Sequence, residues 1–193
     1  MRLPWPVVLA SASPRRQELL KQITTDFRID VADVDETPLP KENPWQTAER
    51  LAQIKAEVVA GRNPEAIVIA GDTVVALEED NFFRQLAKPV DVADAEQMLS
   101  ALSGREHLVI TGVCIRTPKD EDVFSVTTTV TFREMTRDEI HAYVATGEPM
   151  DKAGAYAIQG GAKPFVEKYD GSLTNVIGFP IDEIRASLDR LSK

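Results

Sequence analysis

A chain of 193 residues has the length of one domain, and 43% hydrophobic side chains are enough to build a sizeable core. Its net charge of −9 argues against binding to a nucleic-acid polymer, and no apolar run approaches the roughly 20 residues of a membrane helix. A single cysteine excludes an internal disulfide, two histidines argue against a histidine-rich zinc site, and a cytoplasmic location is expected.

The first predicted elements flank a small, hydroxyl-rich turn. Residues 1–6 lack a signal-peptide cleavage pattern and lead into a strand over Val7–Leu9. The turn contains Ser11 and Ser13, and the helix that follows carries Arg15 and Arg16 in its first turn. Backbone N–H groups at a helix N-terminus, hydroxyls and guanidinium groups together suit a phosphate. The same residues also suit an ordinary helix start with Ser13 as the cap and both arginines solvated, and spacing alone does not separate the two interpretations.

An acidic stretch and a long helix come next. The alternating residues 27–31 predict a strand, after which Glu36 and neighbouring carboxylates are either solvated or ligands of a hard metal. A helix is predicted from Pro44 through about Ala60. Lys55 lies at the border of its apolar face, from which it either extends harmlessly into solvent or reaches into a cleft. The residues expected to face the core are Trp45, Ala48, Leu51, Ile54 and Val58.

Asp72 is the carboxylate that structure alone explains least well. The apolar residues 66–70 predict a central strand buried on both faces, which stops at Gly71-Asp72-Thr73 before a second apolar run over residues 74–77. A carboxylate between two buried runs is costly unless it is paired or bound to a metal. We therefore favour a functional role for Asp72.

The second half of the chain predicts helices, a ribbon of two strands and a glycine-rich segment. A hairpin or irregular loop is expected over residues 78–87, and the small residues from Met150 onward let the backbone approach another surface. The other expected elements are a helix capped by Asp91 and ending at Ser103-Gly104, strands over residues 108–116 and 122–133 with one wet face, a helix with a Thr136–Glu139 capping box ending at Gly147, a strand over residues 165–169 and a final helix over Ile181–Leu191. This order of elements predicts one mixed α/β domain over residues 1–193, with a mixed, twisted sheet flanked by helices and a cleft between two lobes.

Four stretches resemble the Maf family of nucleotide pyrophosphatases, in the family's order and over nearly the whole chain. They are SASPRRQELL near the start, GDTVV at Gly71, Lys88-Pro89, and DKAGAYAIQG continuing to NVIGFP. The resemblance implies a fold related to that of the inosine triphosphate pyrophosphatases. It also implies metal-dependent cleavage of nucleoside triphosphates to the monophosphate and pyrophosphate, in an enzyme that often forms homodimers.

The resemblance also implies roles for individual residues. Asp72 matches the proton acceptor, and Asp72 and Glu36 would hold Mg²⁺ or Mn²⁺. The residues that match phosphate-binding positions are Ser11, Arg15, Arg16, Lys55 and Lys88. Asp151 and Lys152 belong to a matching stretch as well, although an internal ion pair explains them equally well.

Three positions distinguish the family's two branches. Arg15, Thr73 and Gln159 resemble the branch that takes dTTP and UTP, whereas the branch acting on 7-methyl-GTP has Trp, Gln and Glu there. A uracil or thymine edge offers one N–H donor between two carbonyl acceptors, which an amide such as Gln159 can match.

Two other functions remain open from the sequence. A phosphatase of small phosphoesters would use the same cations and carboxylates, and it would release phosphate without pyrophosphate. A non-catalytic regulator of cell division agrees with the family's association with septum formation, and it would bind nucleotide without turnover. Identification of the released product separates these functions from nucleotide pyrophosphatase activity.

Overall fold

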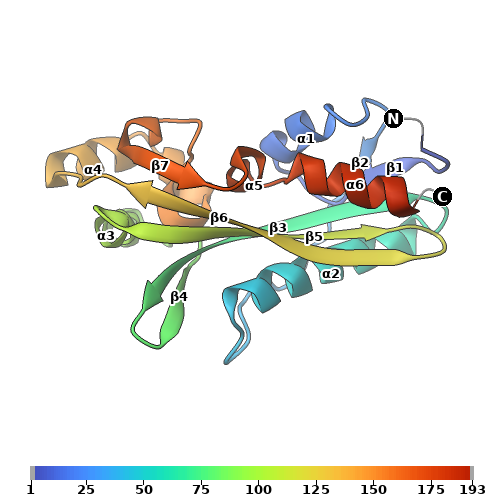
Figure 1. Ribbon diagram of the computed structural model, residues 1–193, viewed down its shortest axis with the longest axis horizontal. Coiled ribbons are helices and arrows are strands. Elements are labelled where there is room, and N and C mark those ends of the chain that lie inside the picture. Colours follow the sequence, from blue (N-terminus) through green and yellow to red (C-terminus); the bar gives the residue numbers. More distant parts are fainter. Residues whose placement is uncertain (1–2, 192–193) are drawn as a thin grey trace. The chain divides into compact units, whose positions relative to one another are not determined.

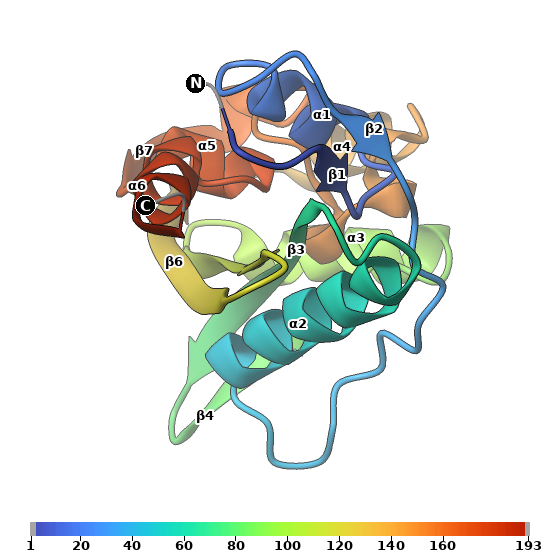
Figure 2. The same cartoon turned by 90° about the vertical axis from the view of Figure 1, so that its right-hand side faces the viewer.

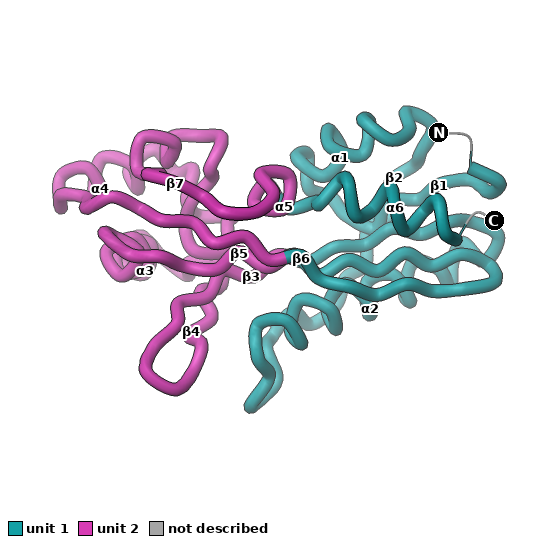
Figure 3. The backbone as a smooth tube through the Cα atoms, in the orientation of Figure 1, with its two compact units in different colours: residues 1–72, 111–126, 178–193 teal, residues 73–110, 127–177 magenta. Residues whose placement is uncertain are grey.

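The computed structural model describes residues 3–191, which form two compact units (Figure 3). Unit 1 comprises residues 1–72, 111–126 and 178–193, and unit 2 comprises residues 73–110 and 127–177. The predicted mixed α/β fold is confirmed, and the cleft between lobes stays a prediction. The first two residues of the predicted approach to the first strand lie outside the described residues.

One mixed sheet contains the described strands. Its order is β2-β1-β3-β5-β6-β7, with β4 paired to β3 beside this path. β1 is parallel to β2 and β3, whereas β4 is antiparallel to β3 and β7 is antiparallel to β6. The bounds are β1 (Val7–Leu9), β2 (Arg28–Ile29), β3 (Ile67–Glu79), β4 (Phe82–Leu86), β5 (Glu106–Arg116), β6 (Glu121–Phe132) and β7 (Val166–Asp170). Four residues join β5 to β6, and a connection this short joins antiparallel strands, as predicted.

The helices begin where the sequence supplies capping side chains. The N-caps of α1, α3 and α4 are Ser13, Asp91 and Thr136, and the predicted capping box of Thr136 with Glu139 is present. The bounds are α1 (Pro14–Leu20), α2 (Pro44–Arg62), α3 (Val92–Leu102), α4 (Arg137–Val144), α5 (Leu173–Ile177) and α6 (Ile181–Leu191), with short 3₁₀ turns at Glu148–Asp151, Ala153–Ala155 and Lys163–Phe165. The five residues of α5 are too few to show a helical period, and this helix was not predicted. No helix within residues 3–191 has both the length and the apolar character needed to cross a membrane.

In unit 1, helices cover both faces of the sheet. α2 lies on one face and α1 and α6 lie on the other (Figures 1 and 2). Under α2, small side chains of the helix meet the strands in a cluster that includes Ala52, Ala56, Val8, Val68 and Cys114, all fully buried. Small residues let the helix approach the strands closely, which brings its polar side chains within reach of the strands.

Two expectations about unit 1 are wrong in detail. β3 runs without a break through Gly71 and Asp72, where β5 is its neighbour in the sheet: a Cβ atom at Gly71 would lie 3.4 Å from the carbonyl oxygen of Gly112. The buried face of α2 is turned from the predicted one: Val58 is 39% exposed, whereas Lys55 is 8% exposed. Contact with the sheet selects the alanine-rich face of the helix, and larger apolar side chains such as Ile54 lie at its edge.

Unit 2 contains the β3–β4 hairpin and the helices α3 and α4, which contact each other. Of the two alternatives for residues 78–87, the structure has the hairpin, with Glu79 opposite Phe82 and a turn at residues 80–81. In β6, Thr128, Val130 and Phe132 are buried and their neighbours are more exposed, which confirms the predicted alternation for this part of the strand.

Candidate active site

The N-terminus of α1 holds one of its two arginines inward. Ser13 caps the helix, and the Ser11 hydroxyl accepts hydrogen bonds from the Ser13 backbone N–H (3.3 Å) and from Arg16 Nη1 (3.2 Å). Arg16 Nε donates to the carbonyl of Gly178 at 2.9 Å. The capping interpretation of Ser13 is therefore confirmed, whereas Arg16 is half-buried and bonded rather than solvated. Its neighbour Arg15 is half-buried as well.

Three charged side chains of unit 1, which we call the Lys55 cluster, meet beside this turn. Lys55 Nζ in α2 lies 2.6 Å from Asp72 Oδ1 in β3 and 2.6 Å from Glu36 Oε1 in the loop after β2. The Lys55 and Asp72 side chains are 9% and 13% exposed, whereas Glu36 is 47% exposed. The cation that a largely buried Asp72 needs is thus Lys55, which bridges the two carboxylates predicted to bind metal.

Arg16 belongs to the same electrostatic environment. Burial lowers the pKa of Arg16, the negative charge of Asp72 raises it, the positive charge of Arg15 lowers it, and Glu36 raises it. The largest of these effects is burial. The charges of the Lys55 cluster therefore act on the guanidinium of the α1 turn, and these residues gather positive and negative groups in one region of unit 1.

Arg50 and Glu42 form a second ion pair that the sequence did not reveal. Arg50 Nε donates to Glu42 Oε1 at 2.5 Å and Nη2 donates to Oε2 at 2.9 Å, and this pairing lowers the pKa of Glu42 to about 2. The negative charge of Asp72 contributes to the raised pKa of Arg50, so Arg50 lies within electrostatic reach of the Lys55 cluster. The signal that could have identified Arg50 as a site residue is its position one and a half turns before Lys55 in α2. No local sequence pattern links Arg50 to Glu42.

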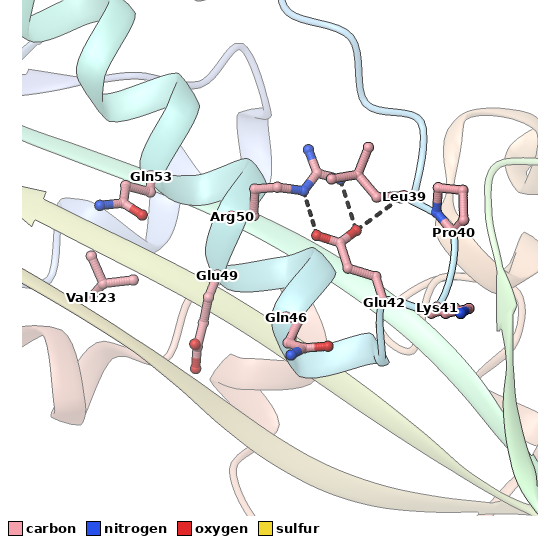
Figure 4. A pocket seen from close by; sticks show the side chains of 9 residues that line it. All are labelled: Leu39, Pro40, Lys41, Glu42, Gln46, Glu49, Arg50, Gln53 and Val123. Atoms are coloured by element: carbon pink, nitrogen blue, oxygen red, sulfur yellow. Dashed lines mark hydrogen bonds and ion pairs between the residues drawn. The ribbon is translucent and has the colours of Figure 1, made fainter.

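The Glu42–Arg50 pair borders a hollow of about 490 Å³ in unit 1 (Figure 4). Its lining residues come from the loop before α2, from α2 and from β6: Leu39, Pro40, Lys41, Glu42, Gln46, Glu49, Arg50, Gln53 and Val123. None of these nine is a site residue predicted from the sequence. The hollow is therefore a feature separate from the Lys55 cluster.

Three predicted site residues belong to unit 2. Thr73 directly follows Asp72 in β3 and is half-buried, Lys88 follows β4 and is exposed, and Gln159 is exposed in a turn after the 3₁₀ segment Ala153–Ala155. Asp151 and Lys152 form an ion pair of 2.5 Å. This pair favours the structural interpretation of those two residues.

A divalent cation would find two carboxylates at the Lys55 cluster. Asp72 and Glu36 oxygens converge on one point, because both lie 2.6 Å from the same nitrogen. Across residues 3–191, no three histidine, cysteine or carboxylate side chains gather closely enough to hold a metal ion. Mg²⁺ in phosphate-transfer sites is commonly held by one or two carboxylates together with phosphate oxygens and water. The donors therefore fit a cation that shares its coordination with a phosphate.

Comparisons with known proteins show the family of this chain. A family model described as Maf-like protein matches residues 6–191. The chain is 48% identical over 184 residues to the dTTP/UTP pyrophosphatase of Myxococcus xanthus, covering 95% of this chain and 91% of that protein. It is 46% identical over 187 residues to the dTTP/UTP pyrophosphatase of Geobacter sulfurreducens, covering 96% of each. The solved structure of the Staphylococcus aureus Ham1 protein matches with a TM-score of 0.55 and 18% identity, over 96% of this chain and 98% of that one, which supports the fold alone.

Proposed function

Because the chain belongs to the Maf family, we propose that it hydrolyses nucleoside triphosphates, dTTP and UTP foremost, to the nucleoside monophosphate and pyrophosphate. Such an enzyme removes unwanted nucleotides from the cellular pool. The two relatives named dTTP/UTP pyrophosphatase support this substrate choice, since each aligns with more than nine tenths of the chain. Within the molecule, the observation that carries the proposal is the Lys55 cluster, whose two carboxylates also act electrostatically on Arg16.

In this reaction a water molecule attacks the α-phosphorus, and the bond from that phosphorus to the oxygen of the leaving pyrophosphate breaks. Asp72 orients the water and accepts its proton, which requires the carboxylate to lie within hydrogen-bond reach of the attacking oxygen. Lys55 is held against Asp72 in the structure and supplies positive charge close to where the phosphate oxygens would lie.

Cations of the α1 turn would hold the phosphate chain. Arg16 is fixed in direction by Ser11 and the Gly178 carbonyl, so little of its freedom remains to be lost on binding. Arg15 and, from unit 2, Lys88 supply further positive charge for the leaving pyrophosphate. Guanidinium groups suit this task because they donate two parallel hydrogen bonds to phosphate oxygens.

The proposal includes Mg²⁺ or Mn²⁺, which Glu36 and Asp72 would hold together with the phosphate oxygens. When bound, the cation neutralises the charge that develops on those oxygens. Lys55 would then turn from the carboxylates toward the phosphates, because the carboxylates gain another positive partner.

Base selection is assigned to Gln159, with Thr73 and Arg15 as the other branch-specific positions. The amide oxygen of Gln159 can accept a hydrogen bond from the N3–H of uracil or thymine, and its NH₂ group can donate one to a neighbouring carbonyl of the base. We place the enzyme in the cytoplasm, with a nucleoside triphosphate and no nucleic-acid polymer as its partner, and we expect the homodimer that the family often forms.

Replacement of the proton acceptor tests the proposal. UTP is incubated with the wild-type protein, Asp72→Asn and the control Asp26→Asn, with Mg²⁺ and with Mn²⁺, and the products are separated by chromatography. Asp26 is an exposed carboxylate of the same unit. We expect UMP and pyrophosphate from the wild type and the control, and at least about a 10²-fold slower reaction for Asp72→Asn with nucleotide binding retained. Phosphate released without pyrophosphate would favour a phosphatase, and a normal rate for Asp72→Asn would remove Asp72 from its role.

A further inference from the structure

Gln159 is carried by a tight turn of unit 2. The backbone N–H of Gly160 donates to the carbonyl of Ala157 at 3.0 Å, which closes the turn over residues 157–160. Ala157 and Ile158 are buried, so the turn has two side chains in the core while Gln159 is exposed. The direction of the Gln159 side chain depends on how firmly the two ends of this turn are held.

Tyr143 of α4 holds the first end. Its hydroxyl oxygen accepts a hydrogen bond from the backbone N–H of Ala157 at 3.1 Å, and Tyr143 as a residue is only 5% exposed. The ring packs edge-on against Phe165, which fixes its position. A buried donor such as this N–H is costly to leave unpaired, so the hydroxyl contributes to the conformation of the turn.

Glu148 holds the second end. Its Oε2 accepts a hydrogen bond from the backbone N–H of Gly161 at 2.9 Å. Lys152 Nζ donates to the Glu148 carbonyl at 2.8 Å, which ties the backbone of Glu148 to the segment that leads into the turn. Glu148 thus contacts the chain on both sides of the turn: its side chain bonds Gly161 after the turn, and its backbone bonds Lys152 before the turn.

Two glycines complete the fit. A Cβ atom at Gly160 would lie 2.1 Å from Glu148 Oε1, and a Cβ atom at Gly161 would lie 2.9 Å from Tyr143 Cε2. A methyl group at Gly161 would therefore overlap the buried Tyr143 ring, whereas one at Gly160 would push aside the movable carboxylate of Glu148. This close packing leaves the turn little room to shift.

We propose that Tyr143 and Glu148 are positioning residues that set the direction of Gln159 and thereby the preference for uracil and thymine. This inference rests on the proposed function. Uracil presents a donor at N3 beside an acceptor at O4, and cytosine presents the reverse pattern, so discrimination depends on an amide held in one orientation. A displacement of about 1 Å is enough to weaken such recognition.

The test compares kcat and KM for UTP and CTP, measured as pyrophosphate release. The variants are Tyr143→Phe, Glu148→Ala and Glu148→Gln, with Gln159→Ala as the reference for lost base reading. Tyr169→Phe and Glu167→Ala are matched controls, since both side chains are exposed on β7. We expect Tyr143→Phe and Glu148→Ala to raise KM for UTP about three- to tenfold with kcat nearly unchanged, and to move the UTP-to-CTP ratio toward that of Gln159→Ala. Glu148→Gln keeps an acceptor oxygen and should recover most of the loss.

Gly160→Ala provides an independent variant. Its new methyl group would displace the Glu148 carboxylate, so its effect should equal that of Glu148→Ala, and the double variant should be no worse than either single one. A ratio that stays at the wild-type value in Tyr143→Phe and Glu148→Ala would overturn the inference, as would equal losses of kcat for both nucleotides or a wild-type ratio in Gln159→Ala. Absence of pyrophosphate release by the wild type from any nucleotide would instead overturn the proposed function.

Discussion

Gly112 of β5 is a point of close approach between the sheet and α2, and Gly112→Ala therefore tests how the Lys55 cluster is placed. A Cβ atom at Gly112 would lie 2.2 Å from both the carbonyl carbon and the carbonyl oxygen of Ala48, and 2.6 Å from the backbone nitrogen of Glu49. These are backbone atoms of a helix, so no side-chain rotation can relieve the overlap. The helix must retreat by about 1.3 Å or more to restore ordinary van der Waals contact, which begins at about 3.5 Å.

The expected loss of stability follows from this displacement. Overpacking a core costs typically about 1–3 kcal/mol, and we expect the upper end of that range because a whole helix must move. The fully buried Ala52 and Ala56 lose contact with the strands as α2 retreats. Lys55 lies two turns after Ala48 on the same face, so its ammonium group also moves away from Asp72, with which it makes a 2.6 Å ion pair.

Gly61→Ala is the matched control, since Gly61 lies in the same helix and a Cβ atom added there would meet no described atom within 4 Å beyond its own stretch of helix. Alanine there should stabilise the protein slightly, by less than about 1 kcal/mol, because Gly61 lies in the last turn of the helix. Urea unfolding of both variants measures the free energies, and UTP hydrolysis at low temperature, where both are folded, measures the effect on the Lys55 cluster. If Gly112→Ala is as stable as the wild type, the close approach of α2 to β5 is not as described.

Three further predictions concern titratable groups. Glu42→Gln should remove about 1–2 kcal/mol of stability at pH 7: Arg50 lowers the Glu42 pKa from 4.5 to about 2, so the contribution is full above pH 4.5 and is lost as the pH falls toward 2. Equal unfolding free energies of variant and wild type at pH 7 would contradict this. Burial lowers the pKa of His107 from 6.5 to about 3, so between these pH values the unfolded chain binds a proton that the folded chain excludes. The free energy of unfolding should therefore fall as the pH drops from 6.5 toward 3. Unfolding curves of His107→Gln should show a free energy that depends less steeply on pH in that window. Burial raises the pKa of Cys114 to about 12, so a disulfide reagent at pH 8 should modify this thiol only after urea unfolds the chain, and rapid labelling of the folded protein would show that the thiol is accessible.

Features that depend on residues close together in the chain could be predicted from the sequence. The Ser13, Asp91 and Thr136 caps form because each side chain bonds a backbone N–H three residues later. The alternation in β6 is likewise a local pattern, whereas the sequence left a hairpin and a loop open for residues 78–87. The family, too, is recognisable from dispersed motifs, since these are strings of neighbouring residues.

Only the tertiary structure decided which side chains meet. Contact with β5 at Gly112, a glycine from a distant part of the chain, sets the buried face of α2. Helical periodicity contains no information on this contact, and it therefore wrongly predicted Val58 as buried and Lys55 at the border of the buried face. Lys55 then meets Asp72 and Glu36, a set that no spacing in the sequence encodes. The sequence alone determined the family and the starts of α1, α3 and α4. The approach of α2 to the strands determined which charges of the candidate site are paired, because that distance depends on packing between segments far apart in the chain.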